Sequence, residues 1–233
     1  MTLLGYDAVL FDLDGTLLNT TPLILSSFRH TLDHYCPGEY GEDEILACLG
    51  EPLLEQMARF GGEEQAEEMV ATYRQHNIAH HDEMVLAFPG VLDTLRLLHQ
   101  KGIRLGVVTN KYRRTVEMGL SLCGLTPFME VVVCLGEAEE AKPHPAPIQL
   151  ALKHLGVAPE RALMVGDSRF DLLAAQRAGT VSVGVAWTHH GKESLLPYHP
   201  DHLIDTMAEL LPILGIEAEE SSVDQVNGSR SHG

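Results

Sequence analysis

A chain of 233 residues, 45% of them hydrophobic, has enough apolar material for one large domain or two modest ones. Its 16 lysines and arginines stand against 33 aspartates and glutamates, and the net charge of −17 argues against nucleic acid or an anionic membrane surface as a partner. The four cysteines form no C-x-x-C pair, and no leader-like start or long apolar run is present, which predicts a cytoplasmic protein with reduced thiols.

The first apolar run, residues 8–11, has the character of a short strand that is covered on both faces of a parallel sheet. Further runs of this kind lie at 103–109, 131–135, 162–165 and 181–185. A glycine follows shortly after each of four intervening helical patterns, as is typical of a helix stop. Those patterns cover 91–100, 113–122, 145–155 and 171–178. The alternation predicts an α/β fold with a doubly wound, Rossmann-like parallel sheet.

The segment 18–86 interrupts this alternation and contains no clear strand. Its helical patterns cover 22–35, 42–48, 52–60 and 63–81. We predict that it forms a small all-helical domain, joined by linkers near 18–20 and 85–89 to a core domain made of 1–17 and 87–215. Three arginines and no lysine stand against thirteen acidic residues in it, which predicts an anionic, solvated outer face. The polar composition of residues 216–233 predicts a disordered tail.

Two aspartates, Asp12 and Asp14, follow the first strand directly and precede Gly15. Ligands of open α/β sheets bind beyond the carboxyl ends of the strands. A turn at Gly15 allows both carboxylates to face one cleft, where they repel each other unless a cation lies between them or one is protonated. A hard divalent ion such as Mg²⁺ meets this need. The alternative for a lone D-x-D is that one aspartate caps a turn and the other is exposed.

The ends of the later strands favour a cation site shared by the two aspartates over a turn cap with one exposed aspartate. Thr109, Asn110 and Lys111 follow the second strand, and Lys142 follows the third after a loop. The fourth strand is followed by GDSRFD at 166–171. Because the carboxyl ends of parallel strands meet at one edge, these groups converge on the placed carboxylate and the cations that phosphoryl transfer needs.

DLDGT at 12–16, Thr109, Lys142 with Pro143, and GDSRFD resemble in order and spacing the four motifs of the haloacid-dehalogenase-like (HAD) phosphohydrolases. The resemblance covers nearly the whole chain to about residue 214, and the helical insertion stands where that family places its first type of cap domain. It implies a phosphohydrolase with Mg²⁺ as cofactor, a Rossmann-like core and a helical cap.

The resemblance also implies roles for individual residues. Asp12 is the nucleophile that becomes an aspartyl-phosphate, and Asp14 is the general acid and then the base. Thr109 and Lys142 hold the phosphoryl oxygens. An aspartate at position 14 separates this chain from the dehalogenases of the family and places it with the phosphatases and phosphomutases. The implied metal site consists of Asp12, Asp14 through its backbone carbonyl, Asp167 and, orienting the others, Asp171.

The substrate is suggested by SSFRHTLDHYCPGEY at 26–40 and YRQHNIAHHDE at 73–83, which resemble the HAD-type inorganic pyrophosphatases of Gram-positive bacteria. Pyrophosphate requires positive charge for its second phosphate. Candidate substrate contacts are Asn110, Lys111, Arg59, Arg74 and His76. For the two arginines the alternative is a surface ion pair with a nearby glutamate.

Other functions remain open from the sequence. A phosphoglycolate phosphatase, or another phosphatase of small phosphomonoesters, shares every core residue and differs in what the cap admits. A phosphomutase is less favoured because nothing indicates a sugar phosphate. A catalytically inactive binding module is less favoured because Asp12, Asp14, Lys142 and Asp167 are all present.

Overall fold

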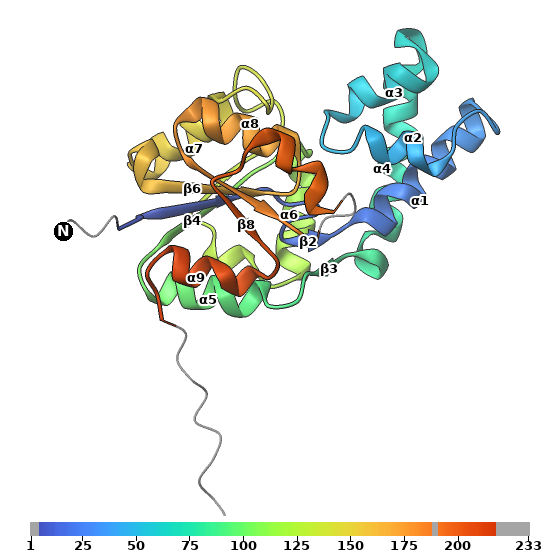
Figure 1. Ribbon diagram of the computed structural model, residues 1–233. Coiled ribbons are helices and arrows are strands. Elements are labelled where there is room, and N and C mark those ends of the chain that lie inside the picture. The colour runs from blue at the N-terminus through green and yellow to red at the C-terminus, as the bar shows by residue number, and fades with distance from the viewer. Residues whose placement is uncertain (1–4, 188–190, 218–233) are drawn as a thin grey trace, which may run out of the picture.

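The computed structural model describes residues 5–187 and 191–217, and it contains a sheet with the strand order β5-β4-β1-β6-β7-β8 (Figure 1). Every neighbouring pair in this sheet is parallel. Its strands are β1 (Ala8–Phe11), β4 (Arg104–Val108), β5 (Val131–Val133), β6 (Ala162–Gly166), β7 (Val181–Val185) and β8 (His202–Ile204). The predicted doubly wound fold is thereby confirmed.

The sequence did not predict β8, the edge strand of this sheet. It has three residues and begins with a histidine, so it is too short and too polar for a hydrophobic period to reveal it. Its backbone pairs with β7, where Val185 lies opposite Ile204. The strand therefore depends on a partner that is distant in sequence.

Helices cover both faces of the sheet because alternate residues of each strand point to opposite sides. Val9 and Phe11 belong to a buried cluster that includes side chains of helices α5, α6 and α9. Ala8 and Leu10 belong to a second cluster with side chains of α7 and α8. Figure 1 shows α7 and α8 on one side of the sheet and α5 and α9 on the other. The bounds of these helices are α5 (Val91–Gln100), α6 (Arg113–Leu122), α7 (Ala146–Leu155), α8 (Arg169–Ala178) and α9 (Leu210–Ile213).

Helix α8 begins two residues before the predicted start, because Ser168 caps it. The Asp171 carboxylate accepts hydrogen bonds from both the backbone N–H and the hydroxyl of Ser168. The carboxylate thereby satisfies the backbone N–H of the residue just before the helix, as the third helical residue does in a capping box. The core domain also contains short 3₁₀ helices, which are η1 (Thr126–Phe128), η2 (Pro159–Arg161), η3 (Lys192–Ser194), η4 (Leu196–Tyr198) and η5 (Met207–Glu209).

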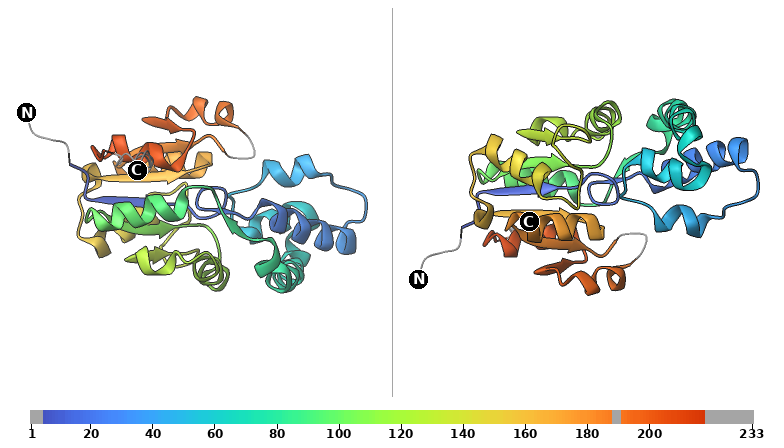
Figure 2. Two further views of the ribbon diagram at one scale, coloured as in Figure 1. Left: turned by 90° about the horizontal axis from the view of Figure 1, so that it is seen from below. Right: turned by 90° about the horizontal axis from the view of Figure 1, so that it is seen from above.

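Four helices between β1 and α5 form a separate group beside the sheet, which both views of Figure 2 show. They are α1 (Thr21–Tyr35), α2 (Glu42–Ala47), α3 (Leu53–Gly61) and α4 (Glu63–Met84). Phe28 lies at their centre and contacts Phe60 and Tyr73 edge to face, with ring centroids 5.9 and 5.2 Å apart. These helices thus share a hydrophobic cluster of their own. We refer to residues 18–86 as the cap, although the exact domain boundaries stay a prediction.

Two short strands that the sequence did not predict join the cap to the core. These strands, β2 (Leu18–Asn19) and β3 (Leu86–Ala87), pair in an antiparallel manner with Leu18 opposite Ala87. They lie within the two predicted linkers. Strands of two residues are too short to show the alternation from which strands are predicted.

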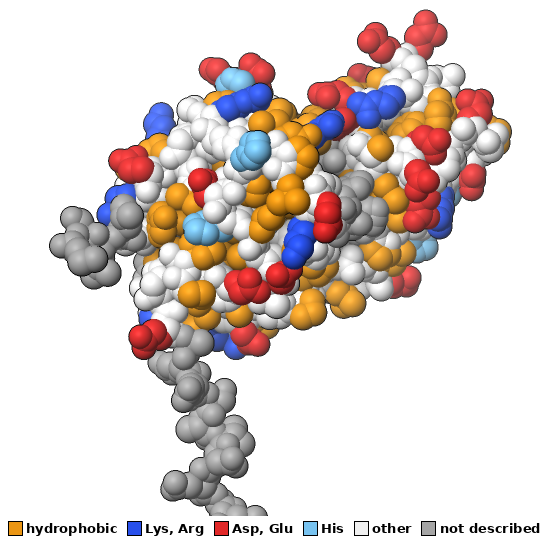
Figure 3. Space-filling model, viewed as in Figure 1, with side chains coloured by type: hydrophobic (Ala, Val, Ile, Leu, Met, Phe, Trp, Pro, Cys, Tyr) orange, Lys and Arg blue, Asp and Glu red, His pale blue; other side chains and the backbone are white. Residues whose placement is uncertain are grey.

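The outer surface of the cap is acidic. Figure 3 shows acidic side chains spread over the visible face of the cap. All acidic residues of the segment 18–86 are exposed except Glu51, which is partly buried. Within the described ranges, no helix has both the length and the apolar character needed to cross a membrane. The sequence predicts a disordered tail at residues 216–233. Of these, residues 218–233 lie outside the described part of the chain.

Candidate active site

The two aspartates after β1 are held by a tight backbone turn. The Leu13 carbonyl accepts hydrogen bonds from the backbone N–H groups of Thr16, Leu17 and Leu18. Gly15 has a φ of +78°, a conformation that glycine adopts without steric cost. Leu13 is fully buried in the core and thereby anchors the turn between the two carboxylates. Both Asp12 and Asp14 line one cavity as a result.

The register of the sheet aligns the strand ends around this turn. Phe11, the last residue of β1, lies opposite Val107 of β4 and Val165 of β6. The residues that follow β4 and β6 therefore emerge beside Asp12. Thr109 and Asp167 are among the residues that line the same cavity.

Lys142 connects the carboxylates at the base of the cavity. Its Nζ lies 2.7 Å from Oδ1 of Asp12, 2.6 Å from Oδ1 of Asp171 and 2.6 Å from the carbonyl oxygen of Val108. Burial alone would lower the pKa of Lys142, but the two carboxylates outweigh it and raise that pKa. Lys142 is therefore a permanently charged group at the floor of the site.

Asp12 is an unusual acid in this environment. Burial raises its pKa to about 7, and the nearby Asp171 carboxylate adds to the rise, while Lys142 opposes it. One ammonium group thus compensates only one of the two adjacent carboxylates. The protein without a bound cation holds a carboxyl group that takes up a proton near neutral pH.

The carboxylates at the floor have the composition of a divalent cation site. Asp12, Asp167 and Asp171 each offer an oxygen, and these oxygens lie within 4.8 Å of one another. A Cβ at Gly15 would lie 2.1 Å from Oδ2 of Asp167, so the absence of a side chain there makes room for this carboxylate. The oxygens of Asp171 are already bonded to Lys142 and Ser168, which suits a supporting role. Oxygen donors of this kind fit Mg²⁺.

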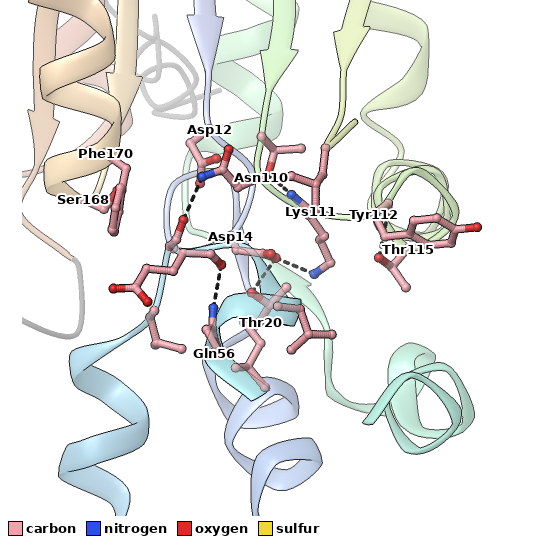
Figure 4. A pocket seen from close by; sticks show the side chains of 18 of the residues that line it. Asp12, Asp14, Thr20, Gln56, Asn110, Lys111, Tyr112, Thr115, Ser168 and Phe170 are labelled. Atoms are coloured by element: carbon pink, nitrogen blue, oxygen red, sulfur yellow. Dashed lines mark hydrogen bonds and ion pairs between the residues drawn. The ribbon is translucent and has the colours of Figure 1, made fainter. Parts of the chain in front are cut away.

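Asp14 lies toward the cap and has different partners. Its Oδ1 accepts hydrogen bonds from the Lys111 ammonium at 2.6 Å and the Thr20 hydroxyl at 2.7 Å, the dashed lines that end on Asp14 in Figure 4. The sequence did not indicate Thr20 as a site residue, since a threonine just before a helix is typical of an N-cap. Here no side-chain capping bond is formed, and the hydroxyl serves Asp14 instead.

Residues of the cap and of the core together line the cavity, which has a volume of about 150 Å³. Of the cap residues predicted to bind substrate, Arg74 reaches it. Its guanidinium carbon lies 4.4 Å from the centre of the Tyr112 ring of the core. Its buried Nε has no hydrogen-bond partner among the described residues. Arg74 therefore contributes to the cavity lining a cation that is stacked on Tyr112.

Most of the predicted site residues converge on this cavity, but two do not. Arg59 lies outside its lining and is paired with Glu51 at 2.5 Å. His76 also lies outside it, where its ring stacks on His30 with centroids 4.6 Å apart and lies tilted against the His80 ring with centroids 4.4 Å apart. His76 follows Arg74 by two positions on α4, which places the two side chains on different faces of the helix. The remaining predicted residues that line the cavity are Asp12, Asp14, Thr109, Asn110, Lys111, Lys142, Asp167 and Asp171.

Comparisons with known proteins agree with this architecture. The family model of the haloacid dehalogenase-like hydrolases matches residues 9–185. Pyrophosphatase PpaX of Anoxybacillus flavithermus is 48% identical over 213 residues, which cover 91% of this chain and 99% of that protein. A haloacid dehalogenase-like family hydrolase from Streptococcus pneumoniae has a TM-score of 0.79 at 28% identity, covering 89% of this chain and 98% of that one. A predicted phosphoglycolate phosphatase from Haemophilus somnus has a TM-score of 0.77 at 26% identity, covering 89% and 97%.

The family match begins within β1 and ends with the last residue of β7, so it includes all four polar strand ends and the cap between them. The resemblance inferred from the four motifs is thus confirmed. The chain belongs to the haloacid dehalogenase-like hydrolase family, and within it the chain is a phosphohydrolase.

Proposed function

We propose that this phosphohydrolase depends on Mg²⁺ and cleaves inorganic pyrophosphate to two phosphates through an aspartyl-phosphate on Asp12. The observation that carries the proposal is the placement of cationic side chains at two levels of one cavity, at its floor and toward the cap. Lys142 is bonded to Asp12 at the floor, and Lys111 is bonded to Asp14 toward the cap. Two linked phosphates require positive charge at both levels. The likeness to pyrophosphatase PpaX supports the same substrate.

The chemistry takes place in two steps. A carboxylate oxygen of Asp12 attacks the phosphorus beside Lys142, and the bond from that phosphorus to the bridging oxygen breaks. Asp14 gives a proton to the bridging oxygen, which leaves with the second phosphate. Asp14 then removes a proton from water, whose oxygen attacks the phosphorus and releases phosphate from Asp12. Both aspartates return to their starting state.

Asp12 and Asp167 are the residues that would hold Mg²⁺, with Asp171 fixing Lys142 and the start of α8 behind them. When bound, the cation supplies positive charge between the Asp12 carboxylate and the anionic substrate. Asp12 must be unprotonated to act as nucleophile, and Lys142 supports that form.

The second phosphate lies toward the cap, where Lys111 and Arg74 are available. The stacking of Arg74 on Tyr112 holds the guanidinium in place before substrate arrives. Planar guanidinium groups donate two parallel hydrogen bonds to phosphate oxygens. Arg59 and His76 are not included in this proposal, because neither lines the cavity.

A phosphate-release assay with Mg²⁺ tests the substrate. We expect pyrophosphate to be hydrolysed with a higher kcat/KM than 2-phosphoglycolate or p-nitrophenyl phosphate. Arg74→Ala should raise the KM for pyrophosphate about tenfold, from the loss of a charge-assisted hydrogen bond, and change p-nitrophenyl phosphate hydrolysis little. Arg29→Ala is the matched control, because Arg29 is an exposed cap arginine that pairs with Glu42. A preference for another substrate would refute the pyrophosphate assignment.

A phosphatase of small organic phosphomonoesters, such as phosphoglycolate, is the second candidate. Part of the cap side of the cavity is apolar, formed by Ile24, Phe28, Leu49, Leu53 and Ile78. Such a wall suits an organic group better than a second phosphate. The same assay decides between the two candidates.

We also propose that the enzyme works in the cytoplasm. All four cysteines are free thiols, and three of them are buried. Free thiols of this kind persist in a reducing compartment.

A further inference from the structure

One turn of the cap makes direct contact with the core beside the active site. It contains Gly50 and Glu51 and connects α2 to α3. Glu51 is the cap acid that is not exposed. Its carboxylate lies 2.5 Å from Arg59 within the cap and 3.4 Å from Arg169 at the start of core helix α8. The Glu51 side chain is 8% exposed, so the carboxylate of this contact is better shielded from solvent than the carboxylates that pair with other arginines of the described chain, although both arginines are about half exposed.

Gly50 fits closely against the core at the same place. A Cβ at Gly50 would lie 2.8 Å from Cδ2 of Phe170, and its φ of +92° is rarely adopted by residues with a side chain. The Gly50 carbonyl oxygen accepts a hydrogen bond of 2.9 Å from Nδ2 of Asn110. The turn therefore contacts the residues that follow both β4 and β6.

Asn110 has no donor left for a substrate in this arrangement. Its Oδ1 accepts a hydrogen bond of 3.0 Å from the backbone N–H of Lys142, and its Nδ2 donates to the Lys142 carbonyl at 2.9 Å. The second N–H of the amide is directed to Gly50. A primary amide has two N–H donors, and both are used (Figure 4 shows Asn110 beside Asp12).

We propose that Asn110 is a positioning residue that couples docking of the Gly50–Glu51 turn to the placement of Lys142. The inference rests on the proposed role of Lys142 at the phosphoryl site. Asn110 ties the backbone of Lys142 to the end of β4, and this fixes the point from which the ammonium reaches Asp12 and Asp171. When the turn leaves the core, the amide loses one partner and holds Lys142 less firmly. By linkage, an ordered Lys142 favours the docked cap.

A double-mutant cycle in kcat tests the coupling. Asn110→Ala should lower kcat at least about tenfold and change KM by less than about threefold, because it disorders a transition-state contact. Glu51→Gln should lower kcat by a smaller factor. In the Glu51→Gln background the effect of Asn110→Ala should shrink by at least about threefold, since the turn is already loosened. In the background of the matched control Glu42→Gln, which removes an arginine pair within the cap, the full effect should remain.

The backbone amide signal of Lys142 in a ¹H–¹⁵N NMR spectrum gives a readout that does not depend on activity. Glu51→Gln should shift this signal although Glu51 has no hydrogen bond to Lys142, whereas Glu42→Gln should leave it in place. The isosteric Asn110→Asp, which lacks the two N–H donors, should reproduce the kcat loss in a protein with unchanged circular dichroism.

Two results would overturn the proposal. One is an Asn110→Ala effect confined to KM, which indicates a substrate contact. The other is that Asn110→Ala lowers kcat by the same factor in the wild type and in the Glu51→Gln background, while the Lys142 amide signal is not shifted by Glu51→Gln. If pyrophosphate is not the substrate, the cycle is run with the phosphomonoester that the wild-type enzyme prefers. Failure of the substrate assignment is thus separate from failure of the coupling.

Discussion

Replacement of the proposed nucleophile should make the metal-free protein more stable while it abolishes turnover. In the fold, burial raises the pKa of Asp12 from an ordinary 3.8 to about 7. The folded protein then binds a proton that the unfolded chain has released, so the contribution of Asp12 to stability falls as the pH rises from about 4 to 7. An asparagine side chain at this position cannot ionise and avoids this loss. Asp12→Asn should therefore increase the free energy of unfolding above neutral pH.

The size of the effect follows from the pKa difference. About three pKa units correspond to about 4 kcal/mol at pH 8, when Asp12 is ionised in both states. At pH 5 the unfolded chain is ionised but the folded site is protonated, and the expected difference is about 2 kcal/mol. These values are upper limits on the gain in stability. In the variant, Lys142 loses the charged Asp12 carboxylate as a partner and faces an uncharged amide oxygen instead. Lys142 keeps its bonds to Asp171 and Val108 in the variant.

Urea unfolding in the presence of EDTA, at several pH values between 5 and 8, measures this difference. Asp33→Asn is the control, since Asp33 is exposed on α1 and its removal should change stability by less than about 0.5 kcal/mol. Added Mg²⁺ should stabilise the wild type more than Asp12→Asn, because a ligand that binds the folded state shifts unfolding. A variant less stable than the wild type at pH 8, or a gain independent of pH, contradicts the electrostatic account.

Two further predictions concern the surroundings of the site. Gly15→Ala should lower activity at least about a hundredfold and weaken Mg²⁺ binding measured by calorimetry, because the new methyl group occupies the place of the Asp167 carboxylate; unchanged Mg²⁺ affinity would contradict this reading. Asp201→Asn should reduce stability by less than about 1 kcal/mol at pH 7: burial raises the Asp201 pKa, the hydrogen bonds from Ser182 outweigh it and lower that pKa, and solvent screens the effect because Asp201 is exposed. Because a lowered pKa stabilises the fold at higher pH, that difference should disappear as acid titrates the folded carboxylate, and thermal unfolding between pH 2 and 7 measures it.

The core of the site was predictable because it depends on local patterns and on one rule of topology. Asp12, Thr109 and Asp167 each follow a short apolar run, and the carboxyl ends of parallel strands meet at one edge. The observed register of β1 with β4 and β6 aligns these ends. No distance had to be known for that prediction. Lys142 follows β5 by a longer loop, and its place in the sequence order of the motifs indicated it.

Residues at the boundary between cap and core were harder to predict. The sequence puts Arg74 and His76 on the same helix, but α4 has polar residues around much of its circumference and gives no clear sign of which face meets the core. Thr20 stands just before α1, a position that carries no sign of its bond to Asp14. The Gly50–Glu51 turn belongs to no periodic pattern, so its contact with Asn110 follows from packing between distant segments alone.

The distribution of charge explains how a strongly acidic protein can bind an anionic substrate. The net charge is −17, yet the acids of the cap lie on its outer surface, where salt screens them beyond about 8 Å at physiological ionic strength. Lys111, Lys142 and Arg74 line the cavity together with Asp12, Asp14, Asp167 and Asp171. Interactions of partly buried charges such as these are screened less than those on the outer surface. Because carboxylates outnumber cations in this lining, binding of a small phosphate depends on the bound divalent cation proposed above as well as on these three side chains. The acidic exterior disfavours large polyanions such as nucleic acids, which cannot enter the cavity and meet the outer face instead.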